Sequence, residues 1–340
     1  MTAAPLRSGR RVRVLCEASS TTGLGHFVRS VALARALAAQ GARVEVLLRP
    51  DALPRAREAV TAAGLDLGPG DWDAVAPASG PPADVVVDSY RVTGTWLTGL
   101  HGALRAAGGR LTVVDDLADR SFTADVVVNQ NLGAERLPYP GAGTVLAGPV
   151  HALLRPEFPA ARAAGLASAD RLPDTPRSVL VLFGGTDPSG MTGPAAHAAL
   201  AAFPGAAVRV IHPPEASPEP ELAAHPRVEL LGPRPGVHED MLGADLVVTA
   251  GGSTLWELCC LARPAAVVAV AGNQTSVYDG MGAGGYVLPL SRAPERSVPR
   301  LAARLAELLA APGRLREVAL AAATVTDGSG TTRVADVLLA

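Results

Sequence analysis

Short runs of β-branched residues alternate with longer alanine- and leucine-rich segments along almost the whole chain. The short runs have the length and composition of buried strands, and the longer segments carry apolar residues at helical spacing. Strands and helices that alternate in this way form parallel sheets whose faces are covered by helices. The sequence therefore predicts an α/β fold.

The chain is long enough for two domains, because 340 residues with 48% hydrophobic composition exceed what one typical core encloses. Residues 156–177 mix proline, alanine and charge, and we expect a linker there between an N-terminal domain of 1–155 and a C-terminal domain of 178–340. In the first domain we expect strands at 12–16, 44–48, 84–87, 111–114 and 126–128, and helices at 25–40, 54–63 and 95–107. In the second we expect strands at 178–183, 208–211, 228–230, 246–249 and 266–270, and helices at 193–202, 254–261, 275–281, 298–310 and 314–323.

The prediction is thus two Rossmann-like domains that face each other across a cleft, with a last helix that could cross back to the first domain. Open parallel sheets bind their ligands outside the carboxyl ends of the strands, so we expect the ligand in that cleft.

Charge and cysteine usage limit the partners and the compartment. A net charge of -2 argues against a partner as strongly anionic as nucleic acid. The three cysteines, Cys16, Cys259 and Cys260, lack C-x-x-C spacing. We expect them to be buried packing residues and the compartment to be reducing. The apolar run at 12–16 is far shorter than the roughly 20 residues that span a bilayer, and no basic amphipathic helix is evident. We therefore expect a cytoplasmic protein that binds neither nucleic acid nor membrane, with its oligomeric state left open.

A polar loop at residues 17–24 joins the first predicted strand to a helix that carries His26 in its first turn. Glycine at 23 and 25 lets the backbone approach a diphosphate or sugar, and the free N–H groups of the helix favour negative charge. The helix dipole disfavours a cationic imidazole there, so His26 is expected to be neutral and able to act as a general base. The alternative is a histidine that only hydrogen-bonds the backbone at a helix start.

Three segments of the second half have the character of ligand loops. Residues 183–188, with Gly185 and Thr186, follow a strand and predict either a phosphate or sugar loop or an ordinary turn. Residues 251–254 lead into a helix whose first turn could hold a diphosphate, and Glu257 lies where it could bind ribose hydroxyls. A capping box between Thr254 and Glu257 would need no ligand, but it gives the preceding glycine pair no role. Asn273 and Gln274 follow the strand at 266–270 and offer amides to a sugar or phosphate, or a helix cap.

Several enzyme classes lack their motifs here. The chain has no lysine and hence no P-loop, and it has no H-E-x-x-H, no G-x-S-x-G and no G-x-G-x-x-G after the first strand. The other histidines have no metal-ligand spacing, so no metal site is predicted. They are His101, His151, His197, His212, His225 and His238.

Taken together, these segments resemble the UDP-sugar hydrolases of pseudaminic acid biosynthesis, which remove UDP from a 2,4-diacetamido-2,4,6-trideoxy hexose, and their spore-coat polysaccharide relatives. The resemblance spans nearly the whole chain, and its pieces come in one order. They are 17–19, 23–26, Arg29, 87–90, 114–118, 129–131, 153–158, 183–188, 251–260, Asn273 with Gln274, and 327–330.

The resemblance implies the two-domain fold of the glycosyltransferase B type, with the nucleotide on the C-terminal domain and the sugar facing the N-terminal one. It implies a UDP-sugar substrate and neither a metal nor a cofactor. His26 would activate or position a water that attacks the anomeric carbon with inversion, and Tyr90 would lie beside it. The implied substrate-binding residues are Gly23, Gly25, Arg29, Gly185, Thr186, Gly252, Ser253, Thr254, Glu257, Asn273 and Gln274. Among them, Glu257 would hold the ribose.

Two departures and two alternatives accompany the resemblance. Glu17 stands where the family usually has aspartate, and Ser30 where it often has cysteine; the longer acid bears on which sugar is used more than on the reaction. A glycosyltransferase of the same fold would differ only in admitting an acceptor hydroxyl in place of water. A sugar-nucleotide binding protein without activity is the third possibility, and the presence of both His26 and Tyr90 counts against it.

Overall fold

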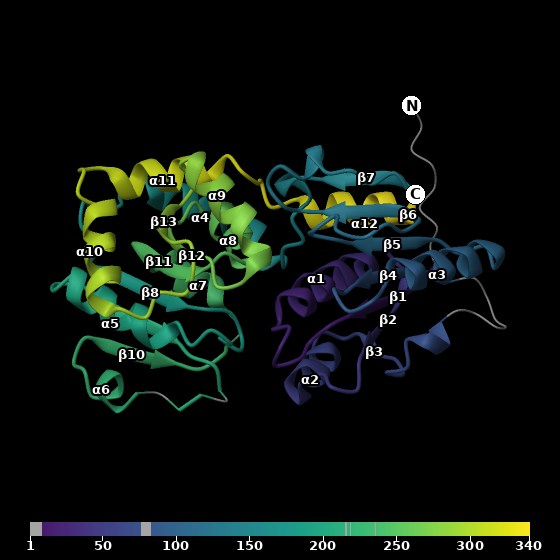
Figure 1. Cartoon of the computed structure of the whole chain (residues 1–340), viewed down its shortest axis with the longest axis horizontal. Helices are drawn as coiled ribbons and strands as arrows, with labels where there is room; N and C mark the ends of the chain where they lie inside the picture. The colour runs from purple at the N-terminus through teal and green to yellow at the C-terminus, as the bar shows by residue number, and fades with distance from the viewer. Residues whose placement is uncertain (1–8, 76–82, 215, 218, 235) are drawn as a thin grey trace. The chain divides into compact units, whose positions relative to one another are not determined.

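The computed structural model describes residues 9–75, 83–214, 216–217, 219–234 and 236–340. They form two compact units (Figure 1). The first contains the chain up to Arg155 together with Ser329–Ala340, and the second contains Pro156–Gly328. Each unit is a parallel sheet covered by helices, so the predicted α/β class with two Rossmann-like domains is confirmed.

The sheet of the first unit has seven strands in the order β3-β2-β1-β4-β5-β6-β7. Their bounds are β1 Arg11–Cys16, β2 Arg43–Leu48, β3 Asp66–Leu67, β4 Ala83–Asp88, β5 Leu111–Val114, β6 Ala124–Asn129 and β7 Ala142–Ala147. The strand order reverses between β1 and β4, and Cys16 lies in register with Asp88 there. Loops that leave these two strands therefore begin at the edge where open parallel sheets bind ligands.

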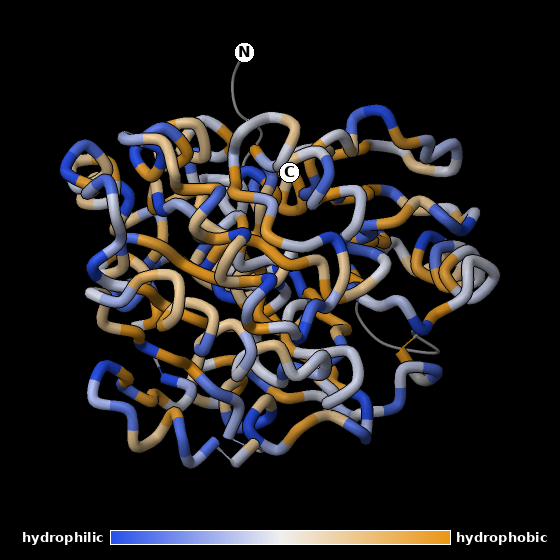
Figure 2. The backbone as a smooth tube through the Cα atoms, turned by 60° about the vertical axis from the view of Figure 1, so that its left-hand side comes forward, coloured by the Kyte–Doolittle hydropathy of each residue, from blue (hydrophilic) through white to orange (hydrophobic). Residues whose placement is uncertain are grey.

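Helices cover both faces of this sheet. They are α1 Gly25–Ala39, α2 Pro54–Ala62 and α3 Gly94–Ala106, with short 3₁₀ turns η1 Asp73–Val75, η2 Ala134–Arg136 and η3 Pro149–His151. Successive side chains of β1 point to opposite faces. Val14 packs into the core that contains Leu33 of α1, and Leu15 into the core that contains Leu97 of α3. Figure 2 shows hydrophobic segments of the backbone in orange through the interior and more hydrophilic ones in blue at many of the outer loops.

The last helix, α12 (Gly330–Leu339), belongs to the first unit and contacts α1. Figure 1 shows it in yellow among the teal strands. A Cβ at Gly330 would lie 2.4 Å from the carbonyl oxygen of Ala152, so only glycine allows this approach. Thr331 then donates its hydroxyl to the carbonyl of Leu154 at 2.7 Å. The structure thus groups residues 329–340 with the N-terminal half of the chain.

The second unit repeats the architecture with six strands in the order β10-β9-β8-β11-β12-β13. The strands are β8 Ser178–Leu182, β9 Ala207–Ile211, β10 Val228–Leu231, β11 Leu246–Ala250, β12 Ala265–Val268 and β13 Leu288–Ser291. The helices are α4 Glu157–Ala169, α5 Thr192–Ala202, α6 Pro220–Ala223, α7 Val237–Leu242, α8 Thr254–Cys260, α9 Thr275–Ala283, α10 Val298–Leu308 and α11 Arg314–Ala323, with η4 at Gly272–Gln274. Here the order reverses between β8 and β11.

Residues 156–177 are not the linker that their composition suggested, because α4 packs inside the second unit against α7, α8 and α11. A Cβ at Gly165 would lie 2.2 Å from the carbonyl oxygen of Leu261, so glycine permits a close helix contact. Arg162 donates to the carbonyls of Cys260 and Ala323 at 2.9 and 2.8 Å. Small residues and one partly buried arginine contribute to this packing beside the buried Phe158, and they give no strong apolar pattern.

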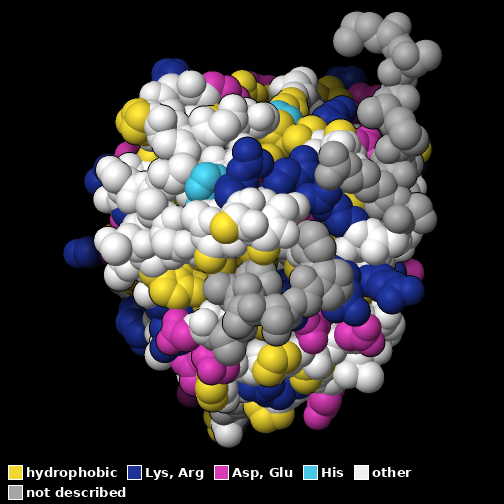
Figure 3. Space-filling view, turned by 90° about the vertical axis from the view of Figure 1, so that its right-hand side faces the viewer, with side chains coloured by type: hydrophobic (Ala, Val, Ile, Leu, Met, Phe, Trp, Pro, Cys, Tyr) yellow, Lys and Arg dark blue, Asp and Glu magenta, His cyan; other side chains and the backbone are white. Residues whose placement is uncertain are grey.

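The surface carries charges of both signs, as Figure 3 shows for one face. Exposed ion pairs join Arg292 to Asp279 and Arg316 to Asp170, at 2.8 and 2.7 Å. The three cysteines are buried and unpaired, as expected. Within the described ranges, no helix combines the length and the apolar character needed to cross a bilayer.

Candidate functional site

The loop between β1 and α1 places His26 at the carboxyl edge of the first sheet. Gly23 has φ of 76°, which favours glycine, and its N–H donates to the carbonyl of Ser19 at 3.0 Å. The Ser19 hydroxyl contacts the hydroxyls of Thr21 and Thr22, so the turn is closed by its own side chains. Helix α1 begins at Gly25, and His26 follows in its first turn with 6% of its surface exposed.

His26 is paired with a buried carboxylate. Its Nδ1 lies 2.5 Å from Oδ1 of Asp88, the last residue of β4, which is completely buried. An ionised carboxylate only accepts hydrogen bonds, so Nδ1 carries the proton. Nε2 is then the nitrogen that can accept a proton. The geometry supplies what a general base needs, a fixed ring with a defined tautomer.

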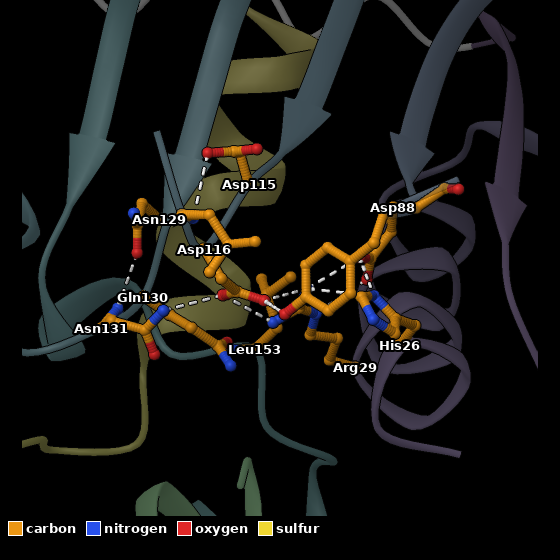
Figure 4. A network of polar contacts seen from close by, with 12 residues as sticks. His26, Arg29, Asp88, Asp115, Asp116, Asn129, Gln130, Asn131 and Leu153 are labelled. Atoms are coloured by element: carbon orange, nitrogen blue, oxygen red, sulfur yellow. Dashed lines mark hydrogen bonds and ion pairs between the residues drawn. The ribbon is translucent and has the colours of Figure 1, made fainter. Parts of the chain in front are cut away.

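Arg29, one turn further along α1, joins Asp88 to Asp116 (Figure 4). It donates to both oxygens of Asp88 at 2.7 Å and to both oxygens of Asp116 at 2.8 and 2.9 Å. Ser30 adds a hydroxyl donor to Asp88 at 2.9 Å. Arg29 was predicted to bind substrate, but here its guanidinium faces two protein carboxylates. That substrate contact stays a prediction, and the observed role is to anchor Asp88.

The charges in this network stabilise one another. Burial raises the pKa of Asp88, but Arg29 and His26 outweigh it and hold that pKa well below its usual range. Burial likewise raises the pKa of Asp116, and Arg29 again outweighs it, so this pKa is also lowered. Burial lowers the pKa of Arg29, whereas Asp116 and Asp88 raise it well above its ordinary value. Both aspartates are therefore charged at neutral pH.

Tyr90 completes the cluster. Its hydroxyl donates to Oδ2 of Asp116 at 2.5 Å, and its ring meets the His26 ring edge-on, with centroids 4.3 Å apart and planes at 85°. Asn131 donates to the other oxygen of Asp116 at 2.9 Å. The structure thus brings together the two residues predicted to be catalytic.

Sequence reasoning noted the segments that contain Asp88 and Asp116 but assigned these residues no role. The signal was present, because Asp88 closes β4 and Asp116 lies two residues after β5, and the carboxyl ends of these parallel strands lie at the same edge of the sheet.

We expect acid to weaken the fold through these aspartates. Their pKa values are lower in the folded chain than the value of about 3.9 in unfolded chains, so the unfolded state takes up protons first. Their contribution to stability is complete at neutral pH and is lost as the pH falls below about 5. Urea unfolding between pH 7 and pH 3 should show a shallower loss for Asp116→Asn than for the wild type. Asp119→Asn, at an exposed position of the same loop, is the control, and parallel curves for all three proteins would contradict this prediction.

In the second unit, the glycine pair at the end of β11 lies against Gln274. A Cβ at Gly251 would lie 3.3 Å from Cβ of Gln274, and one at Gly252 would lie 3.8 Å from its Nε2. The side-chain oxygen of Gln274 accepts the N–H of Val270 at 3.0 Å, which fixes the side chain. The fold thus brings together the loops that follow β11 and β12, and the binding of a ligand there stays a prediction.

The capping box that competed with this interpretation is not formed. The N-cap of α8 is Ser253, without a side-chain capping bond, so Thr254 is already the first helical residue. A box between Thr254 and Glu257 would need Thr254 itself at the N-cap. Glu257 is buried on this helix with 8% of its surface exposed, and Asn273 lies in η4 beside Gln274.

The loop of Gly185 and Thr186 has a different environment. Asp187, at φ of 37°, accepts the N–H groups of Met191 and Thr192 at 3.0 and 2.8 Å, so a protein carboxylate occupies the first turn of α5. The loop borders a pocket of about 180 Å³. Its polar lining includes Thr186, Asp187, Thr192, His212 and Glu219. Two carboxylates in the wall make this a poor place for a phosphate.

Solved structures share the fold of these two units. MurG of Acinetobacter baumannii matches with a TM-score of 0.62 at 17% identity, over 97% of this chain and 99% of that one. UGT89C1 of Arabidopsis thaliana, complexed with UDP, matches with a TM-score of 0.62 at 14% identity, over 97% and 100%. A putative UDP-N-acetylglucosamine 2-epimerase from Listeria monocytogenes matches with a TM-score of 0.61 at 12% identity, over 96% and 95%.

The chain has the glycosyltransferase B fold. At these identities the structural similarity establishes the fold alone. No protein-family model and no curated protein sequence matches the chain.

Proposed function

We propose that the chain hydrolyses a UDP-linked amino- or acetamido-deoxyhexose, releasing UDP and the free sugar. The observation that carries this proposal is the buried pair of His26 and Asp88, which leaves one imidazole nitrogen able to accept a proton. Support for the nucleotide comes from the shared fold, because structures with it include UGT89C1 bound to UDP and a putative UDP-N-acetylglucosamine 2-epimerase. The resemblance of the whole motif set to UDP-sugar hydrolases favours attack by water over transfer to an acceptor.

In the proposed reaction, a water oxygen attacks the anomeric carbon while Nε2 of His26 takes one of its protons. The bond between that carbon and the diphosphate oxygen breaks, and UDP leaves with the electron pair. The sugar is released with inverted configuration, and the imidazolium returns its proton to solvent. Asp88 stabilises the imidazolium that forms, and Arg29 with Ser30 keeps Asp88 in place.

The second unit is proposed to bind the nucleotide. Gly252, Ser253 and Thr254 would offer backbone and hydroxyl donors to the diphosphate, with Asn273 and Gln274 next to them. Glu257 would accept hydrogen bonds from the ribose hydroxyls. The position of Gln274 against the glycine pair supports this assignment, because it fixes an amide beside two residues that have no side chains of their own.

The purified protein should release UDP from a UDP-2,4-diacetamido-2,4,6-trideoxyhexose without an added acceptor. Glu257→Gln keeps the shape of the side chain but weakens acceptance from ribose hydroxyls, so it should raise KM by about tenfold or more with a smaller change in kcat. Initial rates of UDP release over a range of substrate concentrations measure both constants. Glu317→Gln, exposed on α11, is the control. UDP formed only when a sugar or polyol acceptor is supplied would favour the glycosyltransferase instead.

A further inference from the structure

Glu17 holds the segment that carries Tyr90. It directly follows β1, and its side chain is buried with 1% of its surface exposed. The hydroxyl of Ser89 donates to Oε1 of Glu17. The N–H of Arg91 lies 3.0 Å from the Ser89 hydroxyl and 3.3 Å from the same Glu17 oxygen. The residues on both sides of Tyr90 are therefore tied to the end of the neighbouring strand.

Tyr90 is thus held at two places. Glu17 fixes its backbone through Ser89, and Asp116 accepts its hydroxyl at 2.5 Å. Between these two attachments its ring meets the ring of His26 at a centroid distance of 4.3 Å. If the backbone attachment were removed, the hydroxyl bond alone would leave the ring free to pivot away from His26.

The other oxygen of Glu17 has no hydrogen-bond partner among the described residues. A buried carboxylate oxygen without a partner costs free energy, so stability alone does not account for an acid at this position. Glutamine would keep an accepting oxygen for Ser89 and would remove the buried charge.

We propose that Glu17 is a positioning residue, which acts through Ser89 to keep the Tyr90 ring against His26. The catalytic consequence rests on the proposed function, whereas the geometric one does not. In the sequence Glu17 was part of the resemblance and a departure from aspartate, and in this chain its carboxylate reaches Ser89 at the end of the neighbouring strand.

NMR of histidine-labelled protein tests the geometric part. The Tyr90 ring current shifts the ring protons of His26, and the His26→Ala spectrum assigns those signals. Glu17→Met and Ser89→Ala should each move the His26 signals by more than half of the change seen in Tyr90→Leu, and Glu17→Gln should leave them in place. Asp51→Asn, which removes the exposed partner of the Arg91 guanidinium at 2.6 Å, is the control and should not move them. Unmoved His26 signals in both Glu17→Met and Ser89→Ala would overturn the proposal.

Kinetics and stability complete the test. Glu17→Met and Ser89→Ala should lower kcat between about tenfold and a hundredfold with little change in KM, and the double variant should be no worse than either single one. Glu17→Gln should retain kcat and should be at least as stable in urea as the wild type. A Glu17→Gln variant as impaired as Glu17→Met would contradict the positioning role. If the wild type releases no UDP, the proposed function fails while the NMR result still decides the role of Glu17.

Discussion

His26→Ala is expected to lower kcat for UDP release by about 10²- to 10⁴-fold while leaving the affinity for UDP nearly unchanged. The imidazole is the group proposed to take the proton from water, and no second imidazole appears in the described hydrogen-bond network around Asp88. The fold should survive the change, because Asp88 keeps its bonds from Arg29 and Ser30. Steady-state kinetics gives kcat, and calorimetric titration with UDP gives the affinity.

His101→Ala is the matched control for this prediction. His101 lies on α3, and its Nε2 is 3.5 Å from a carboxylate oxygen of Asp125. It is thus a second histidine near an aspartate in the same unit, but it is not part of the cluster that contains Tyr90 and Arg29. Its loss should leave kcat within about twofold of the wild type, since exposed or partly exposed side chains away from a site have small effects. Full activity in His26→Ala would remove His26 as the base.

Arg29→Met is expected to destabilise the protein by about 3–5 kcal/mol at pH 7. Methionine replaces the stem of the side chain but leaves the carboxylates of Asp88 and Asp116 buried without their cation. Burial then raises the pKa of both acids above the unfolded value, so the folded state takes up protons first. The variant should therefore gain stability as the pH falls from 7 towards 5, the opposite of the wild-type trend below pH 5. Urea unfolding at several pH values measures both effects.

Arg292→Met is the matched control, because it removes an arginine from an exposed pair with Asp279. Solvent screens that pair, so its loss should be much smaller than the loss at Arg29. Equal losses of stability at Arg29 and Arg292 would contradict the role of Arg29 in anchoring Asp88.

The sequence was sufficient for the architecture, because alternating short apolar runs and helical segments are a local signal. It predicted most strands and helices of both sheets, and it identified the loops at the carboxyl edges. It missed β3, β7 and β13. Glycines at and just before β7 give it a weak strand pattern, and a Cβ at Gly141, which precedes the strand, would lie 2.1 Å from the carbonyl oxygen of Phe122. The tight packing that requires glycine there is visible only once the neighbouring strand is in place.

Long-range packing also explains the misplaced linker. Arg162 of α4 donates to the backbone carbonyls of Cys260 and Ala323. These residues lie 98 and 161 positions further along the chain, so the bonds that hold α4 are long-range ones. Its small residues permit a close helix contact, as at Gly165, but they resemble a flexible linker in composition. Composition alone therefore could not distinguish a packed alanine-rich helix from a connection between domains.

The candidate site was predictable only in part, because its residues also come together through long-range packing. His26 was identified from its loop and Tyr90 from the family resemblance, but the partner of His26 lies 62 residues away at Asp88. That pairing depends on β4 lying next to β1 with Cys16 in register with Asp88. The roles of Asp116 and Glu17 depend on the same strand order, which no local pattern specifies.

Hydrolysis in water enriched in ¹⁸O tests the central claim most directly. If water attacks the anomeric carbon with His26 as the base, mass spectrometry at short reaction times will find one ¹⁸O atom in the released sugar and none in UDP. Incorporation of ¹⁸O into UDP would mean attack at phosphorus, and UDP released only when an acceptor is supplied would mean transfer; either result would contradict the account.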